Sequence, residues 1–210
     1  MIIAVDGPTA SGKGTIARAL AAHFGLPHLD TGLLYRAVGR QCFLDGGDPD
    51  NPVSALAACT FPAGLLDDPE LRSEETGGLA SRVSIHTAVR EALFERQRSF
   101  ATRPGGAVLD GRDIGTVIAP EAEAKLFVTA SIPARAERRY REMQAQGRQA
   151  SLEEITADLT LRDERDRKRK DAPLMAAQDA VVIDTSGLRR EEAIAAAIAA
   201  VNAALDRHRA

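Results

Sequence analysis

The segment GPTASGKGT, close to the start of the chain, has the residue types and the spacing of a phosphate-binding loop. The apolar run IIAVD precedes it and a helical pattern follows it, which is the strand–loop–helix context that such loops require. Glycines let backbone N–H groups wrap around a phosphate, and the helix start adds partial positive charge. Lys13 can reach the β- and γ-phosphates of a nucleotide. The segment therefore predicts a site for nucleotide phosphates.

One position of this loop departs from the usual pattern. Gly14 stands where a Ser or Thr would bind magnesium, and the hydroxyl comes one residue later, at Thr15. A defective nucleotide switch, a chance match and a loop built for another task are the alternatives. A GTPase-type switch would carry a base-reading N-K-x-D motif, which the sequence lacks. We expect Gly14 to let the backbone come close to phosphate, and Thr15 to contact either phosphate or metal.

The segment LDTGLLYRAV places polar side chains directly after a short apolar run. Thr31 is expected to cap a new helix, and Tyr35 and Arg36 follow on its first turns. Arg36 can point back toward the crevice at the sheet edge. An ordinary helix cap with a solvated arginine explains the same pattern equally well.

The segment AVLDGRDIGTVIAP also follows an apolar strand. Asp110 is placed like a Walker B carboxylate, which can hold magnesium through water, and Gly111 permits a tight turn. Arg112 and Asp113 then project from the mouth of the sheet. A turn with two solvated charges is the weaker alternative, because the polar cluster directly follows a core strand.

The segment LRDERDRKRKDAPL carries a dense charge pattern. Arg162, then Arg165 or Asp166, and then Arg169 recur at helical spacing, so they are predicted to share one face. An Asp between arginines would hold them in register and could bind a sugar hydroxyl. A nucleic-acid surface or a solvated helix face is the alternative, but interleaved acids and the lack of stacking aromatics disfavour nucleic acid.

Short, near-continuous apolar runs alternate with helical patterns, which predicts an α/β fold with a doubly wound parallel sheet. In such folds ligands bind beyond the carboxyl ends of the strands, where Gly7, Asp30 and Asp110 fall. The segment from 45 to 78 is predicted to be an inserted subdomain. Strands are expected at 2–5, 28–29, 107–109, 125–129 and 180–184, and helices at 13–24, after 31, at 81–100, from Pro133, from the capping box Ser151–Glu154, and at 190–207.

The totals limit the classes of protein that remain. A chain of 210 residues with 27% charged residues is ordinary for one globular domain. The formal net charge of -3 gives no general attraction to nucleic acid or acidic membrane. There is no signal-peptide pattern and no membrane-length apolar run, and two Cys fit a reducing cytosol. We expect a cytoplasmic monomer that binds neither membrane nor nucleic acid.

The order and spacing of four segments resemble those of the bacterial cytidylate kinases, and the resemblance covers nearly the whole chain. The segments are GPTASGKGT, DTGLLYR, DGRDIGTVIAP-EAEAKLFVTAS and RDERDRKRKDAPL. The loop is shared with many nucleotide kinases, whereas the DGRDIGT segment and the RDERDRKRKDAPL segment are far more specific. The resemblance implies a P-loop kinase fold with a central five-stranded parallel sheet. It also implies one domain over 1–210, with an acceptor-binding insertion at about 37–104 and a lid at about 138–165. Residues 60–76 are too short for the full β-rich insertion that the family usually carries, and Gln144 to Gly147 is expected to be a turn at the lid tip.

The same resemblance implies that ATP phosphorylates CMP or dCMP, with Mg²⁺ as cofactor. Phosphorylation of UMP as well, or of another small acceptor, is the alternative within kinases. Catalysis is assigned to Lys13, Arg112 and Arg162, and Mg²⁺ is expected to meet Thr15 and Asp110 only through water or phosphate. The implied ATP-binding residues are Gly7, Pro8, Thr9, Ala10, Ser11, Gly12, Lys13, Gly14 and Thr15. The implied CMP-binding residues are Thr31, Tyr35, Arg36, Ser81, Arg90, Arg112, Asp113, Arg162, Asp166 and Arg169.

Overall fold

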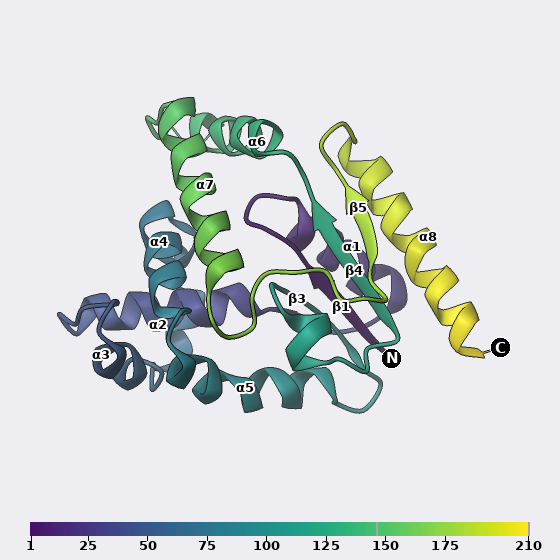
Figure 1. Cartoon of the computed structure of the whole chain (residues 1–210), viewed down its shortest axis with the longest axis horizontal. Coiled ribbons are helices and arrows are strands. Elements are labelled where there is room, and N and C mark those ends of the chain that lie inside the picture. The colour runs from purple at the N-terminus through teal and green to yellow at the C-terminus, as the bar shows by residue number, and fades with distance from the viewer. Residues whose placement is uncertain (146, 210) are drawn as a thin grey trace.

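The computed structural model describes residues 1–145 and 147–209, and its centre is a five-stranded, fully parallel sheet (Figure 1). The strand order is β2-β3-β1-β4-β5, so the chain reverses its winding direction beside β1. Each predicted strand is present to within two residues, and the α/β prediction is confirmed. The strands are β1 (Ile2–Asp6), β2 (His28–Asp30), β3 (Ala107–Gly111), β4 (Ala124–Thr129) and β5 (Val181–Asp184).

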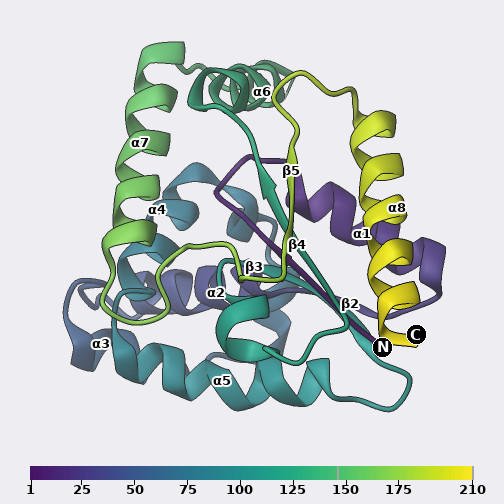
Figure 2. The same ribbon diagram turned by 45° about the vertical axis from the view of Figure 1, so that its right-hand side comes forward.

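Helices cover both faces of the sheet, as its mostly apolar strands require. On one face, α1 (Lys13–Phe24) and α8 (Arg190–Arg209) pack side by side over β1, β4 and β5 (Figure 2). The other face packs against the short π-helical turn η3 (Ile114–Ile118) and the end of α5 (Thr87–Ala101). The two apolar layers fix the strand ends relative to one another, and therefore fix the loops that follow them.

The chain between β2 and β3 forms a helical unit with its own apolar core. Residues 60–76 hold two 3₁₀-helices and the start of α4 (Glu74–Val83), and no strand. This unit consists of α2 (Thr31–Leu44), α3 (Pro52–Ala57), η1 (Ala63–Asp67), η2 (Pro69–Arg72), α4 (Glu74–Val83) and α5.

Two local predictions in this unit were wrong. The single helix expected over 81–100 is broken at Ser84–His86, where His86 becomes the N-cap of α5 and its imidazole Nε2 lies 2.9 Å from the Pro49 carbonyl oxygen. Thr31 is the first residue of α2 and not its N-cap, which is Asp30. Its hydroxyl instead donates to the Asp110 carbonyl at 2.9 Å, because β3 runs beside β2 and offers that acceptor.

Two further helices, α6 (Ile132–Ala145) and α7 (Leu152–Lys168), lie beyond the carboxyl edge of the sheet and pack on each other (Figure 1). The predicted capping box of Ser151 and Glu154 is confirmed. Arg169 follows α7 as its C-cap, so the charged face predicted from 162 to 169 ends just past the helix. The turn predicted at 144–147 includes Gln146, which lies outside the described residues. Within the described part of the chain, no helix has the length and apolarity to cross a membrane.

Candidate active site

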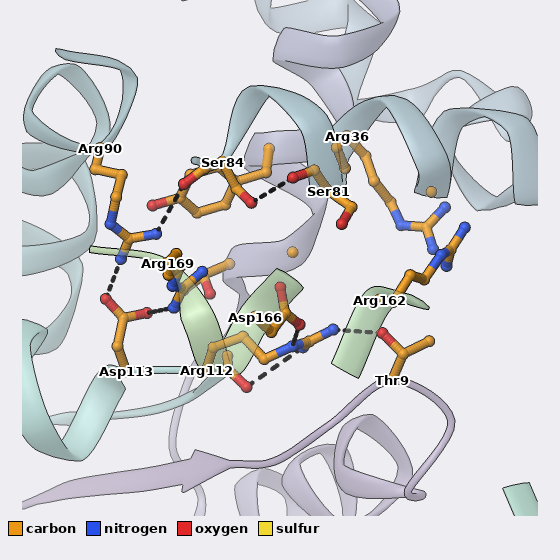
Figure 3. Close-up of a pocket in the computed structure, with 16 residues that line it drawn as sticks. Thr9, Arg36, Ser81, Ser84, Arg90, Arg112, Asp113, Arg162, Asp166 and Arg169 are labelled. Carbon is orange, nitrogen blue, oxygen red and sulfur yellow. Dashed lines mark hydrogen bonds and ion pairs between the residues drawn. The ribbon is translucent and has the colours of Figure 1, made fainter. Parts of the chain in front are cut away.

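Two adjoining pockets open at the carboxyl edge of the sheet, between α4, α7 and the loops after β1 and β3. The first, called here the inner pocket, is the smaller of the two. The second, called the loop pocket, is larger and surrounds the glycine-rich loop, and Thr9, Arg36 and Arg112 border both. The inner pocket is lined by all the residues assigned to CMP, namely Thr31, Tyr35, Arg36, Ser81, Arg90, Arg112, Asp113, Arg162, Asp166 and Arg169 (Figure 3).

The glycine-rich loop has a backbone conformation that residues with a Cβ would adopt only under strain. Gly7 has a φ of 155°, and a Cβ there would lie 2.0 Å from the Val128 carbonyl oxygen. Gly12, the N-cap of α1, has a left-handed φ of 89°. The glycines therefore let the loop curl back against β4 and aim the first N–H groups of α1 at the loop pocket. Residues 9–15 line that pocket, whereas Gly7 and Pro8, which were also assigned to ATP from the sequence, do not.

Lys13, Gly14, Thr15 and Asp110 lie together on the floor of the loop pocket. Burial and the nearby Arg112 guanidinium lower the pKa of Lys13 to about 8. A Cβ on Gly14 would lie 3.6 Å from Asp110 Oδ2, an ordinary contact, so packing against protein does not require glycine here. Gly14 instead leaves open space beside the Asp110 carboxylate.

The Asp110 side chain is buried and its Oδ1 lies 2.7 Å from Nε2 of His28. His28 was not identified from the sequence as part of the site. The described residues contain no cluster of three or more metal-ligating side chains. One buried carboxylate and one nearby hydroxyl fit Mg²⁺, which keeps several waters and binds nucleotide phosphates through few protein groups.

Arg112 links the two pockets. Its Nε donates to Asp166 Oδ2 at 2.8 Å, and its Nη2 donates to the Thr9 hydroxyl at 2.5 Å. Burial alone would raise the pKa of Asp166, but the Arg112 guanidinium beside it holds that pKa below its ordinary value. Asp166 therefore stays ionised and fixes Arg112 between α7 and the glycine-rich loop (Figure 3).

The deep end of the inner pocket pairs a carboxylate with two arginines. Arg90 Nη2 donates to Asp113 Oδ2, and Arg169 Nη2 lies 3.8 Å from Asp113 Oδ1. The Arg90 guanidinium also lies 5.6 Å from the centre of the Tyr35 ring. Because Asp113 and Arg90 are both buried, this end presents one fixed acceptor group and one fixed donor group.

Asp6 supports this end from below, and sequence reasoning missed it. Its carboxylate accepts hydrogen bonds from the N–H groups of Ile114 and Gly115, both at 2.8 Å. Those residues directly follow Asp113, so Asp6 anchors the turn that carries it. Burial raises the pKa of Asp6 to about 7 despite these two N–H donors. Only the strand pairing of β1 with β3 brings the two segments together, so local sequence carried no signal.

The shallow end of the inner pocket is strongly cationic. A Cβ on Gly77 would lie 2.9 Å from Nη2 of both Arg36 and Arg162, so glycine makes room for two guanidinium groups that lie close together (Figure 3). Arg36 is held by the carbonyls of Leu71 and Ser73, at 2.7 and 2.8 Å. Burial, with Arg162 and then Arg139, lowers the pKa of Arg36 to about 10. Clustered cations of this kind favour a bound anion.

Several arginines of α6 also face the loop pocket, and none was assigned from the sequence. Arg138 donates to the Thr185 hydroxyl at 3.0 Å, and that hydroxyl donates to the Ser11 carbonyl at 2.9 Å. The arginine-rich pattern of this helix was visible, but not which of its faces turns toward the loop. The predicted alternative at 165 is also resolved, since Arg165 donates to the Ser81 hydroxyl at 2.8 Å while Asp166 lines the pocket. The α6 side chains at the loop pocket are Arg138, Arg139, Arg141 and Glu142.

Known proteins resemble this chain over almost all of its length. The family model described as cytidylate kinase matches residues 3–203. A cytidylate kinase of Xanthobacter autotrophicus is 56% identical over 203 residues, which cover 97% of this chain and 98% of that protein. A cytidylate kinase of Azorhizobium caulinodans is 55% identical over 204 residues, with 97% and 99% covered. For a cytidylate kinase of Caulobacter vibrioides the identity is 53% over 210 residues, with 99% and 98% covered. The sheet, the glycine-rich loop and these matches agree, and the chain belongs to the cytidylate kinase family.

Proposed function

We propose that the two pockets form one active site, in which the γ-phosphoryl group of ATP is transferred to CMP or dCMP. The observation that carries this proposal is that the two ends of the inner pocket differ. A donor–acceptor pair lies at its deep end, and clustered arginines lie where it meets the loop pocket. A nucleoside monophosphate has the matching order, a base at one end and a phosphate at the other.

The deep end supports a choice of cytosine over uracil. Cytosine offers an amino donor at N4 and an acceptor at N3, and uracil reverses both. The Asp113 carboxylate can accept from N4, and a guanidinium at this end, from Arg90 or Arg169, can donate toward N3. Uracil would instead place its O4 acceptor against a carboxylate. A site built in this way discriminates strongly, because the wrong base leaves buried polar groups unpaired.

The reaction needs no general base, because the acceptor is already an anionic phosphate. Catalysis then consists of holding two polyanions in line and neutralising their charge. Lys13 and the N–H groups of the loop would hold the ATP phosphates, and Arg162 with Arg36 would hold the phosphate of CMP. Arg112 borders both pockets and is therefore placed to stabilise the group in transfer.

The segment from about 138 to 165 is proposed as a lid that excludes water, because water would otherwise hydrolyse ATP. It brings Arg139 and Arg141 over the loop pocket. Asp110 and Thr15 would hold Mg²⁺ through water or phosphate oxygens, and the ion would neutralise charge on the phosphates of ATP. The acceptor-binding insertion is proposed at about 37–104, where the helical unit supplies Ser81 and Arg90.

We further propose a cytoplasmic monomer that binds neither nucleic acid nor membrane. The charged segment at the end of α7 supports the absence of nucleic-acid binding, because Arg162 and Arg169 face the inner pocket and Arg165 bonds to Ser81. Those basic groups are directed at a small ligand and not at an extended backbone. Tight, salt-sensitive binding of a labelled oligonucleotide would argue for the alternative.

An ADP-release assay with AMP, CMP, dCMP, UMP, dTMP and GMP tests the proposed function. We expect rapid turnover with CMP and dCMP and far slower turnover with the others. The matched control is Lys13→Ala, which should cut the rate steeply while the thermal unfolding curve stays near that of the unmodified protein. Equal rates with UMP and CMP would contradict the proposed reading of the base, and near-normal turnover by Lys13→Ala would remove the loop from the mechanism.

A further inference from the structure

One carboxylate lies among the arginines at the border of the two pockets, and the proposed reaction does not use it. Glu74 stands in the first turn of α4, directly after its N-cap Ser73. Its side chain forms ion pairs with Arg139 of α6 and with Arg162 Nη2 of α7, the latter at 3.6 Å. Arg162 Nη2 also donates to the Glu74 main-chain carbonyl at 3.1 Å. Glu74 thus connects the helical unit after β2 to both helices of the proposed lid.

The charges around Glu74 are mostly positive. Arg36, Arg139 and Arg162 lie close enough that the last two lower the pKa of Arg36, after burial. Among the described ion pairs, each of the two arginines that Glu74 contacts has one other acid: Asp158 lies 3.0 Å from Arg162 Nε, and Glu142 lies 3.0 Å from Arg139 Nη1. Those two acids are more exposed than Glu74, at 44% and 60% against 31%. Glu74 is the acid that these two arginines share.

Under the proposed function, these arginines serve phosphates. Arg162 lines the inner pocket and Arg139 lines the loop pocket, so a phosphate at their border would meet the same guanidinium groups as the Glu74 carboxylate. A phosphate presents more charge and more acceptor oxygens than a carboxylate, so it can displace one from an arginine. Without any anion, the like charges of the cluster would repel one another and spread the side chains.

We propose that Glu74 is a positioning residue that stands in for a nucleotide phosphate. Its carboxylate holds Arg139 and Arg162 at the border of the pockets, and when a nucleotide binds it gives up these arginines to phosphate oxygens. This inference rests on the proposed function, because it assumes that the inner pocket receives a phosphate. Because the carboxylate competes with the phosphate for these arginines, CMP should bind more weakly than the arginines alone would allow.

The test compares Glu74→Gln with Glu75→Gln. Both substitutions remove one negative charge from the same helix turn, but Glu75 is exposed and has no ion pair among the described contacts. The affinities for CMP and for cytidine, which lacks the phosphate, are measured by calorimetry at fixed ionic strength. We expect Glu74→Gln to tighten CMP binding about 3- to 10-fold, from the usual strength of a partly exposed ion pair, and to leave cytidine unchanged.

The other outcomes separate the alternatives. Weaker CMP binding by Glu74→Gln would mean that Glu74 only supports the arginines and does not compete with the phosphate. Equally tighter CMP binding by Glu74→Gln and Glu75→Gln would mean that the effect comes from net charge alone. Either result overturns the inference while the proposed function stands. Unmodified protein that binds neither CMP nor cytidine overturns both. Glu74→Ala, which also removes the side-chain arm, should tighten CMP binding in the same direction, and thermal unfolding confirms that each variant is folded.

Discussion

The buried ion pair between Arg135 of α6 and Asp163 of α7 is the interaction whose loss should be most costly. The two side chains are 2% and 3% exposed, and they form two parallel hydrogen bonds of 3.0 and 2.6 Å. Arg135 also donates to the carbonyl of Ala130 at 2.9 Å and to that of Thr9, in the glycine-rich loop, at 3.1 Å. This one guanidinium therefore joins both helices of the proposed lid to the loop.

Asp163→Asn preserves the shape of the side chain but leaves the Arg135 cation buried without its counter-ion. Breaking a buried pair in this way costs about 3–5 kcal/mol. For a chain of this length each kcal/mol lowers the melting temperature by about 2–4 °C, so we expect a decrease of roughly 10 °C. Calorimetric unfolding of the ligand-free protein measures it directly.

The neighbouring Glu164→Gln is the matched control. Glu164 is 58% exposed and its pair with Lys168 is 3.4 Å long, so its loss should cost less than about 0.5 kcal/mol. A second test replaces both buried partners, as Arg135→Met with Asp163→Leu, which should recover most of the stability because no charge remains buried. The double variant lacks the Arg135 donor to the Thr9 carbonyl, so its KM for ATP should be higher than that of the unmodified protein. If Asp163→Asn unfolds within 1 kcal/mol of the unmodified protein, or if the double variant binds ATP normally, the reasoning fails.

Three further predictions concern the reaction. Because the pKa of Lys13 is about 8, kcat/KM for ATP should fall as the pH rises past about 8. The value of kcat, which reports the nucleotide-bound form, should fall only at higher pH. A kcat/KM that stays constant up to about pH 9.5 would contradict this prediction. Asp113→Asn should reduce the preference for CMP over UMP by about tenfold or more, because the amide can donate to uracil O4; the ratio of kcat/KM values measures it, and an unchanged ratio would refute the role. Asp166→Ala should raise the KM for CMP more than that for ATP, and equal increases in both would assign Asp166 to the lid instead.

Locally encoded features were predicted well from the sequence. The capping box at Ser151 and the helix from Lys13 to Phe24 depend on residues within a few positions of each other, and both are confirmed. The strands were recognisable because a parallel sheet buried on both faces needs continuous apolar runs. Two failures, at Thr31 and at Ser84–His86, occur where a neighbouring segment offers a better hydrogen-bond partner than the local chain does.

The resemblance to the cytidylate kinases pointed to ten of the residues that line the inner pocket. The sequence alone determined the class of fold and the glycine-rich loop. These follow from residue type and spacing, because strand ends in a parallel sheet meet at one edge and a loop of this kind must precede a helix. Only the tertiary structure decided which charged and polar groups pair. Asp6 is separated from Gly115, Arg135 from Asp163, and Glu74 from Arg162 by long stretches of chain, and each pair meets through the packing of separate elements. The strength of an ion pair depends on its distance and burial, and both are properties of the folded chain.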